Sequence, residues 1–109
     1  MKNNMFKQLK TYVQENNLHE KAMKDFWVAF NNWKEESPEE YRRVFKDILI
    51  DDLDVFIHYI GLRSAEWPNC ERNHVTVTIF IHHEDFQLGY YAWWHSLDGD
   101  DDDDFLVIN

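Results

Sequence analysis

The sequence HVTVTIFIH, residues 74–82, alternates between two kinds of side chain. Val75, Val77, Ile79 and Ile81 occupy every second position, which is the period of a strand with one face on a core. The following HED, residues 83–85, predicts a turn. The aromatic run FQLGYYAWWH, residues 86–95, predicts a second strand, because aromatic residues favour strands. This hairpin is the expected centre of the fold.

Helical patterns fill the first half of the chain. Apolar residues recur at three- and four-residue steps across residues 4–14 and 18–35, which predicts two amphipathic helices separated by the turn-forming pair Asn16 and Asn17. Ser37 followed by Pro38 predicts the start of a third helix, and Glu40 would complete a capping box with Ser37. We expect this third helix to end near residue 50.

Strand patterns fill the second half. An apolar strand is expected over residues 54–62, then a loop over 64–72, the central hairpin, a connection over 96–104 and a short fourth strand over 105–108. The sequence therefore predicts a single α+β domain over residues 1–109, with a helical half (1–50) and a sheet half (53–109). Three N-terminal helices would pack on one face of a C-terminal four-stranded antiparallel meander.

The net charge of −10 is unevenly distributed along the chain. Residues 1–50 contain nine Lys or Arg and eight Asp or Glu, whereas residues 51–109 contain two and thirteen. This excess of carboxylates argues against binding to nucleic acid or to anionic membranes, since both require basic side chains. The same field would speed encounter with a basic protein, and acidity also serves solubility.

The chain has a single cysteine, Cys70, so neither an internal disulfide nor a cysteine zinc site can form. The N-terminal residues lack an apolar signal segment, and no run approaches the roughly 18 apolar residues of a membrane span. We therefore expect a cytoplasmic protein that does not insert into a membrane.

The aspartate-rich stretch DGDDDDD, residues 98–104, is partly similar to a calcium-binding loop. Asp98, Asp100 and Asp102 match its first, third and fifth positions. However, Asp103 occupies the position that needs glycine, and Asn109 occupies the position that needs a bidentate glutamate. We therefore expect a solvated connection between strands or a negative patch for a basic surface, and no specific calcium site.

Five of the six histidines lie in the sheet half: His58, His74, His82, His83 and His95. The predicted hairpin places His82 and His83 at its turn and brings His74 and His95 together as approximate neighbours at its open end, so the five cannot share one metal. Phosphate-binding loops and nucleophile motifs are also missing from the sequence. We expect neither a metal, a cofactor nor a catalytic site.

Aromatic residues are expected on the sheet face that the helices leave open. If Val75 and its partners face the helices, Phe80 faces the other way, and either the pair Tyr90 and Trp94 or the pair Tyr91 and Trp93 joins it. Exposed contiguous apolar area usually marks an interface, and tryptophan and tyrosine are common anchors.

These patterns favour a small acidic protein-binding module, most concretely an immunity- or antitoxin-like protein that neutralises a basic partner. The candidate steering residues are Asp98, Asp100, Asp101, Asp102, Asp103 and Asp104, and the candidate anchors are Tyr90, Trp93, Trp94 and Trp67. One alternative is a homodimer with a structural or small-ligand-binding role, which would bury the aromatic face or pair an edge strand. Another is a metal-binding protein or enzyme that uses the sheet histidines.

Overall fold

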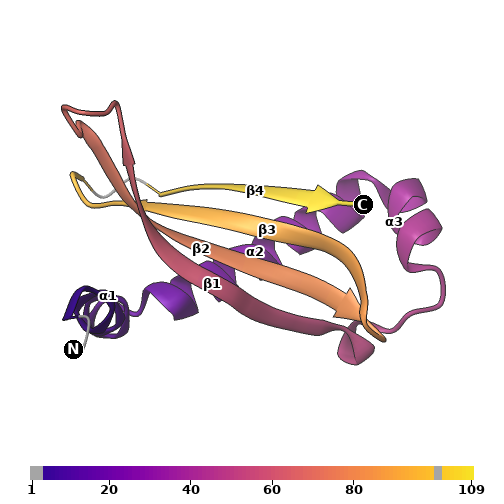
Figure 1. Ribbon diagram of the computed structural model, residues 1–109. Coiled ribbons are helices and arrows are strands. Elements are labelled where there is room, and N and C mark those ends of the chain that lie inside the picture. Colours follow the sequence, from indigo (N-terminus) through magenta and orange to yellow (C-terminus); the bar gives the residue numbers. More distant parts are fainter. Residues whose placement is uncertain (1–3, 100–101) are drawn as a thin grey trace.

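The computed structural model describes residues 4–99 and 102–109. Three helices precede a four-stranded antiparallel sheet with the strand order β1-β2-β3-β4 (Figure 1). The elements are α1 (Asn4–Glu15), α2 (Leu18–Glu36), α3 (Pro38–Phe45), a short 3-10 helix η1 (Ile50–Asp52), β1 (Asp54–Ala65), β2 (Arg72–His83), β3 (Phe86–Ser96) and β4 (Asp102–Ile108). The predicted α+β class and the meander topology are confirmed.

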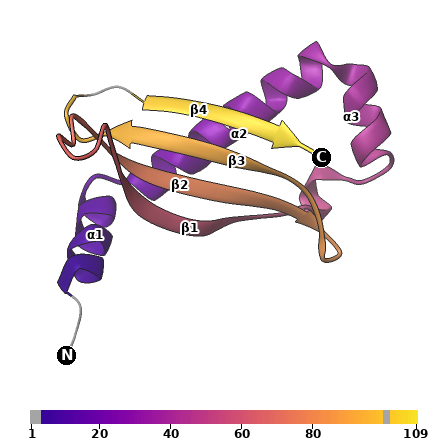
Figure 2. The same ribbon diagram turned by 45° about the horizontal axis from the view of Figure 1, so that its top comes forward.

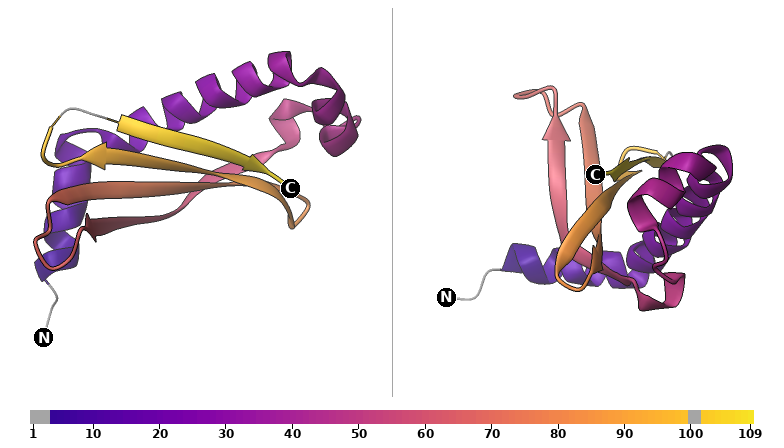
Figure 3. Two further views of the ribbon diagram at one scale, coloured as in Figure 1. Left: turned by 90° about the horizontal axis from the view of Figure 1, so that it is seen from above. Right: turned by 90° about the vertical axis from the view of Figure 1, so that its right-hand side faces the viewer.

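The helices lie on one side of the sheet and leave its other face open. Helix α2 runs obliquely across the strands, with α3 beyond one end of the sheet and α1 at the other (Figures 1 and 2). The view from above shows the same two layers, with α2 on one side of the strands and no helix on the opposite side (Figure 3). The result is an elongated molecule of 47 × 30 × 23 Å.

The core lies between α2 and the middle strands. Leu18, Ala22, Phe26 and Phe30 recur every four residues on α2 and are fully buried. They pack against the alternating β2 residues Val75, Val77, Ile79 and Ile81, which are also fully buried. The two periods in the sequence therefore identified the two faces of this core, because each is the repeat of its own element.

The junction between α2 and α3 differs from the predicted capping box. Ser37 ends α2 and precedes α3, with φ −130° and ψ 59°, and its side chain makes no capping hydrogen bond. Its backbone serves both helices instead, since its N–H donates to Trp33 O and its carbonyl accepts from Tyr41 N. Pro38 is the first residue of α3, as predicted.

Helix α3 is shorter than predicted and ends at Phe45 rather than near residue 50. Phe45 is fully buried, and Lys46 then adopts a positive φ of 50°, which turns the chain out of the helix. This early end is a tertiary effect. Once Phe45 is seated against the α2 aromatics, the chain needs the remaining residues and η1 to reach the start of β1.

The sheet contains more residues than the sequence pattern predicts. The turn between β2 and β3 consists of Glu84 and Asp85, both with positive φ, which is the pattern of a type I′ hairpin turn. β4 begins at Asp102 rather than Phe105, so three predicted connection residues are strand residues. Backbone pairing with β3 thus extends into a stretch whose side chains give no strand signal.

Candidate functional site

The register between β2 and β3 decides which aromatic residues reach the open face. Trp93 pairs with the core residue Val77, and Tyr91 pairs with Ile79, so both point toward the helices and are buried. Tyr90 and Trp94 therefore face the open side. The structure selects this pair from the two alternatives that the alternation in the sequence allowed.

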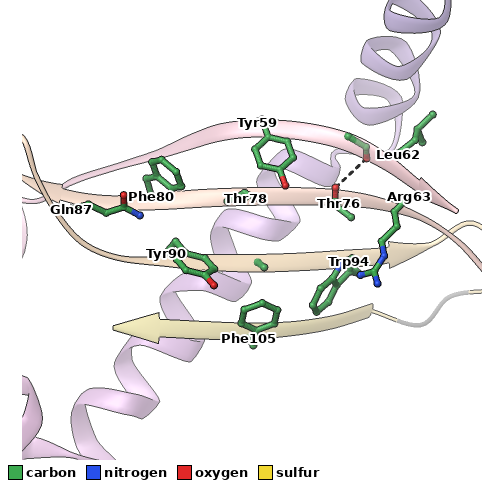
Figure 4. A pocket seen from close by; sticks show the side chains of 12 residues that line it. Tyr59, Leu62, Arg63, Thr76, Thr78, Phe80, Gln87, Tyr90, Trp94 and Phe105 are labelled. Carbon is green, nitrogen blue, oxygen red and sulfur yellow. Dashed lines mark hydrogen bonds between the residues drawn. The ribbon is translucent and has the colours of Figure 1, made fainter. Parts of the chain in front are cut away.

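The open face is hollowed at its centre, because small side chains there are surrounded by large ones. This hollow of about 590 Å³ is called here the aromatic groove (Figure 4). Its floor consists of Gly61, Thr76, Thr78 and Ala92, and the residues around it are Tyr59, Phe80, Tyr90, Trp94, Phe105 and Arg63. The volume lies in the range of pockets that bind ligands or partner side chains.

Ring contacts hold the walls of the groove in place. On one side, Phe105 of β4 contacts Tyr90 and Trp94 of β3, with ring centroids 6.1 and 5.1 Å apart. On the other side, His58 stacks on Phe80 at 4.0 Å. Such walls are already ordered, so a partner that contacts them does not have to immobilise flexible side chains.

One cationic side chain lies at the groove. The guanidinium carbon of Arg63 lies 6.0 Å from the centre of the Trp94 ring, a cation–π arrangement. The other basic residue of the sheet half, Arg72, pairs with Glu66 at 3.4 Å. Within the part of the chain that the structure describes, Arg63 has no carboxylate partner.

A second hollow, of about 420 Å³, adjoins the aromatic groove at Trp94 and is called here the acidic hollow. Four acidic residues line it, together with Arg72 and His74; they are Glu71, Asp98, Asp102 and Asp103. The open face thus combines an apolar centre with a negative end. This is the arrangement expected of a surface that meets a basic partner.

The candidate steering aspartates have different roles in the structure. Asp98 accepts a hydrogen bond from Asn73 N at 2.9 Å, and Asp103 accepts one from Asp104 N at 2.8 Å. Asp102 and Asp104 point toward the helix side of the sheet edge, where each contacts a β3 side chain. Asp100 and Asp101 lie outside the described residues.

Two candidate anchors lie away from the groove. Trp93 is only 1% exposed and belongs to the core, so it cannot serve as a surface anchor, and this part of the sequence hypothesis is corrected. Trp67 is 80% exposed in the connection between β1 and β2 and does not line the groove. Tyr90 and Trp94 are the two candidate anchors that the structure brings together.

Strand β3 carries a row of polar contacts on its helix side. Each of three alternate residues places a donor or ring nitrogen against a carboxylate: Tyr91 Oη to Asp104 Oδ2 at 2.6 Å, Trp93 Nε1 to Asp25 Oδ2 at 2.9 Å, and His95 Nδ1 to Asp102 Oδ1 at 2.6 Å. Asp25 comes from α2 and the other two carboxylates from β4. These contacts connect β3 to α2 and to β4, and they satisfy polar atoms of large rings.

The alkaline pH dependence of stability tests the contact between Tyr91 and Asp104. Burial and the hydrogen bond to the Asp104 carboxylate raise the pKa of Tyr91 above its ordinary value. The unfolded chain therefore releases this proton above pH about 10 while the folded chain retains it, and stability falls there by up to about 1.4 kcal/mol per pH unit. Tyr91→Phe is expected to cost about 1–2 kcal/mol at pH 7, because Asp104 loses its donor, and to cost less at pH 11.

Urea unfolding of both proteins at pH 7 and pH 11 measures this difference. Tyr59→Phe, on the exposed face of β1, is the control. Its free energy of unfolding should stay within about 0.5 kcal/mol of the native value at both pH values. A cost of Tyr91→Phe that is identical at the two pH values would contradict the assignment.

The histidines do not gather into one site. His74 and His95 lie at the open end of the hairpin, but His74 pairs with Ser96 and faces the open side while His95 faces the helix side. His82 and His83 lie at the turn, as predicted. Among residues 4–99 and 102–109, no group of three or more metal-binding side chains is arranged to hold an ion. No helix in these ranges is long and apolar enough to cross a membrane.

Tyr59, Arg63 and Phe105 belong to the groove but were not among the candidate residues. Tyr59 reaches the open face because of a bulge at His58, where the pairing with β2 shifts between Ile57 and Tyr59. Phe105 reaches it because β4 pairs Phe105 with Ala92. Neither the bulge nor this register has a local sequence signal, whereas the alternation of β2 was sufficient to place Phe80 on the open face.

Known proteins offer no further guide to this surface. No family model matches the chain, and neither the curated proteins nor the solved structures contain a significant match.

Proposed function

We propose that this chain is a small protein-binding module that takes a basic protein partner on its open sheet face. The most concrete form of this function is that of an immunity- or antitoxin-like protein, which neutralises its partner by covering a basic surface. The observation that carries the proposal is the continuity of the aromatic groove with the acidic hollow through Trp94.

Two parts of this surface would act at different stages of binding. The carboxylates of the acidic hollow would attract a basic partner over a distance of about one Debye length and increase the association rate. The rings of the groove would then bury apolar side chains of the partner and slow its dissociation. The charge distribution supports this division, because residues 51–109 carry thirteen of the 21 acidic residues and two of the eleven basic ones.

The partner's chemistry follows from the groove. Its floor offers no charged side chain and admits an apolar or aromatic group, since Gly61 and Ala92 leave room between the rings. The adjoining hollow suits a lysine or arginine close to that group. A basic surface segment that presents an aromatic side chain beside a cation satisfies both requirements.

Trp94→Ala is the variant that tests this proposal. Proteins captured by the native chain are identified, purified and measured for direct binding to both forms. We expect a basic partner whose dissociation constant rises about thirtyfold or more with Trp94→Ala, mainly through faster dissociation. Phe86→Ala is the matched control, since Phe86 is 76% exposed at the turn end of β3 and lies outside the groove.

The steering role has its own variant, Glu71→Gln combined with Asp103→Asn. This pair avoids Asp102 and Asp104, whose carboxylates contact β3 side chains. We expect association about threefold slower at low salt, a weaker salt dependence and an unchanged dissociation rate. A partner that binds both this variant and Trp94→Ala with native rates would place its site elsewhere and refute the proposal.

A further inference from the structure

Strand β1 is an unguarded sheet edge. It is 12 residues long and, within residues 4–99 and 102–109, pairs only with β2, so in this part of the chain the N–H and C=O groups on its other side have no strand partner. It contains neither lysine nor proline, which often protect such edges, and its one irregularity is the bulge at His58. The opposite edge is protected, because β4 has seven residues and begins with three aspartates. One edge is therefore open to strand pairing and the other repels it.

Helix α1 projects beyond this open edge. It crosses beneath the strands near the end of β1 and continues past it (Figures 2 and 3). A strand added next to β1 would therefore lie above the projecting part of α1. Val13 is its only buried residue, whereas Phe6 is 71% exposed. Phe6, Leu9, Val13 and Ile60 line a hollow of about 360 Å³ between α1 and β1. A helix of 12 residues is marginal in water alone, so this apolar face needs a cover.

The sequence of β1 is complementary to itself in one antiparallel register. The bulge at His58 reverses the alternation, so Val55 and Ile57 before it face the helices together with Ile60 and Leu62 after it. A two-fold axis between residues 58 and 59 then places matching faces opposite each other. The resulting cross-strand pairs are Asp54 with Arg63, Val55 with Leu62, Phe56 with Gly61, and Ile57 with Ile60.

These pairs are chemically favourable. Asp54 meets Arg63 of the second copy, twice by symmetry, and neither residue has an ion-pair partner in the described part of its own chain. Phe56, which is 39% exposed, lies against Gly61, where no side chain competes for space. Ile57 lies opposite Ile60, the β1 residue nearest α1, so α1 of each copy extends beneath Ile57 of the other.

The charge distribution also favours a second copy here. α1 and β1 together contain three basic residues, Lys7, Lys10 and Arg63, and two acidic ones, Glu15 and Asp54. The acidic hollow is lined by the start of β2, the end of β3 and the start of β4, and in this antiparallel register the hollows of the two copies lie at opposite ends of the interface. Contact through β1 therefore keeps the negative ends apart, whereas contact through β4 would bring them together.

From these observations we propose that two copies of the chain associate through β1 to form a continuous sheet of eight strands. The interface is isologous, as in most dimers. The inference rests on the β1 edge and not on the proposed function. The interface takes up Gly61 and Arg63 at the β1 side of the aromatic groove and leaves Tyr90, Trp94 and Phe105 outside it, so each copy keeps these rings for a partner.

Sedimentation velocity across a concentration range tests the dimer, and charge reversal tests its register. We expect a dimer of the native chain at micromolar concentration that is preserved or strengthened by 0.5 M NaCl, because salt screens the repulsion between two chains of net charge −10. Asp54→Arg and Arg63→Asp should each weaken association about tenfold, and their combination should restore it, since the paired charges are then exchanged. Leu62→Lys should give a monomer.

Trp94→Ala separates this interface from the open face, and far-ultraviolet circular dichroism confirms that each variant is folded. Trp94→Ala should leave the dimer unchanged. A native chain that remains monomeric at 100 µM overturns the inference. A dimer that survives Leu62→Lys also overturns the inference. A dimer that is lost only with Trp94→Ala would show that the chain self-associates through the aromatic groove, and this result would overturn the proposed function as well.

Discussion

Phe30→Ala is expected to destabilise the protein by about 4 kcal/mol, a large part of the total stability of a domain of this size. Phe30 is fully buried in the middle of α2 and contacts five other aromatic rings. Their ring centroids lie 5.5–6.2 Å from that of Phe30, and the rings belong to Phe26, Trp27, Trp33, Tyr41 and Phe45. Because Tyr41 and Phe45 come from α3, the substitution also removes one of the two α2 rings, Phe30 and Trp33, that contact both of them.

The loss of stability in Phe30→Ala would come from lost side-chain packing and not from a lower helix propensity. Alanine has the highest helix propensity, so the substitution favours α2 locally and opposes it only through the cavity left behind. Val28→Ala on the same helix is the matched control, because Val28 is 53% exposed and its loss should cost less than about 0.5 kcal/mol. Urea unfolding measures both variants, and equal effects would show that Phe30 does not centre this cluster.

Gly89→Ala is expected to cost about 2–3 kcal/mol, because a side chain here collides with the neighbouring strand. A Cβ atom on Gly89 would overlap the carbonyl oxygen of Val107 and lie 3.2 Å from the Cα atom of Ile108. Both are backbone atoms, which cannot move aside without separating β4 from β3. The contact between Tyr91 and Asp104 depends on the same strand pairing and should be lost with it.

Gly61→Ala is the control for this prediction. Its added Cβ would meet only ordinary contacts, the nearest being 3.5 Å from Thr76 Oγ1. Its stability should stay within about 0.5 kcal/mol of the native value. The two glycines lie in β-strands, so a similar cost for both would show that the effect of Gly89 arises from strand propensity and not from the close approach of β4. Urea unfolding monitored by tryptophan fluorescence gives both values.

The limits of prediction in this chain are clearest at β3. Its run of aromatic residues is apolar on both faces, so alternation alone leaves open which of Tyr90, Tyr91, Trp93 and Trp94 are buried. The answer depends on pairing with β2 and on the extra residue Leu88, where the register shifts between Ile81 and His82. A one-residue shift would exchange the two faces, and no local pattern specifies it.

The aspartate run, residues 98–104, is a second place where local sequence was insufficient, because here the sequence predicts no strand and the structure contains one. Its composition is typical of a solvated connection, and strand propensity argues against pairing. Asp102, Asp103 and Asp104 nevertheless pair with His95, Trp94 and Trp93, because β3 offers a long edge and two of its side chains bind these carboxylates. The free energy that stabilises this strand comes from contacts with residues that are distant in sequence.

The sequence by itself determined the helix stripe of α2, the buried face of β2, the order of the elements and the concentration of acid in the sheet half. These features depend on periodicity and composition, which are local. Only the tertiary structure decided which aromatic residues form the groove, where α3 ends, which aspartates pair inside the sheet, and that β1 has a free edge with α1 projecting past it. These features depend on bulges, strand register and the packing of α3 on α2, because the energies that select them come from contacts between separate elements.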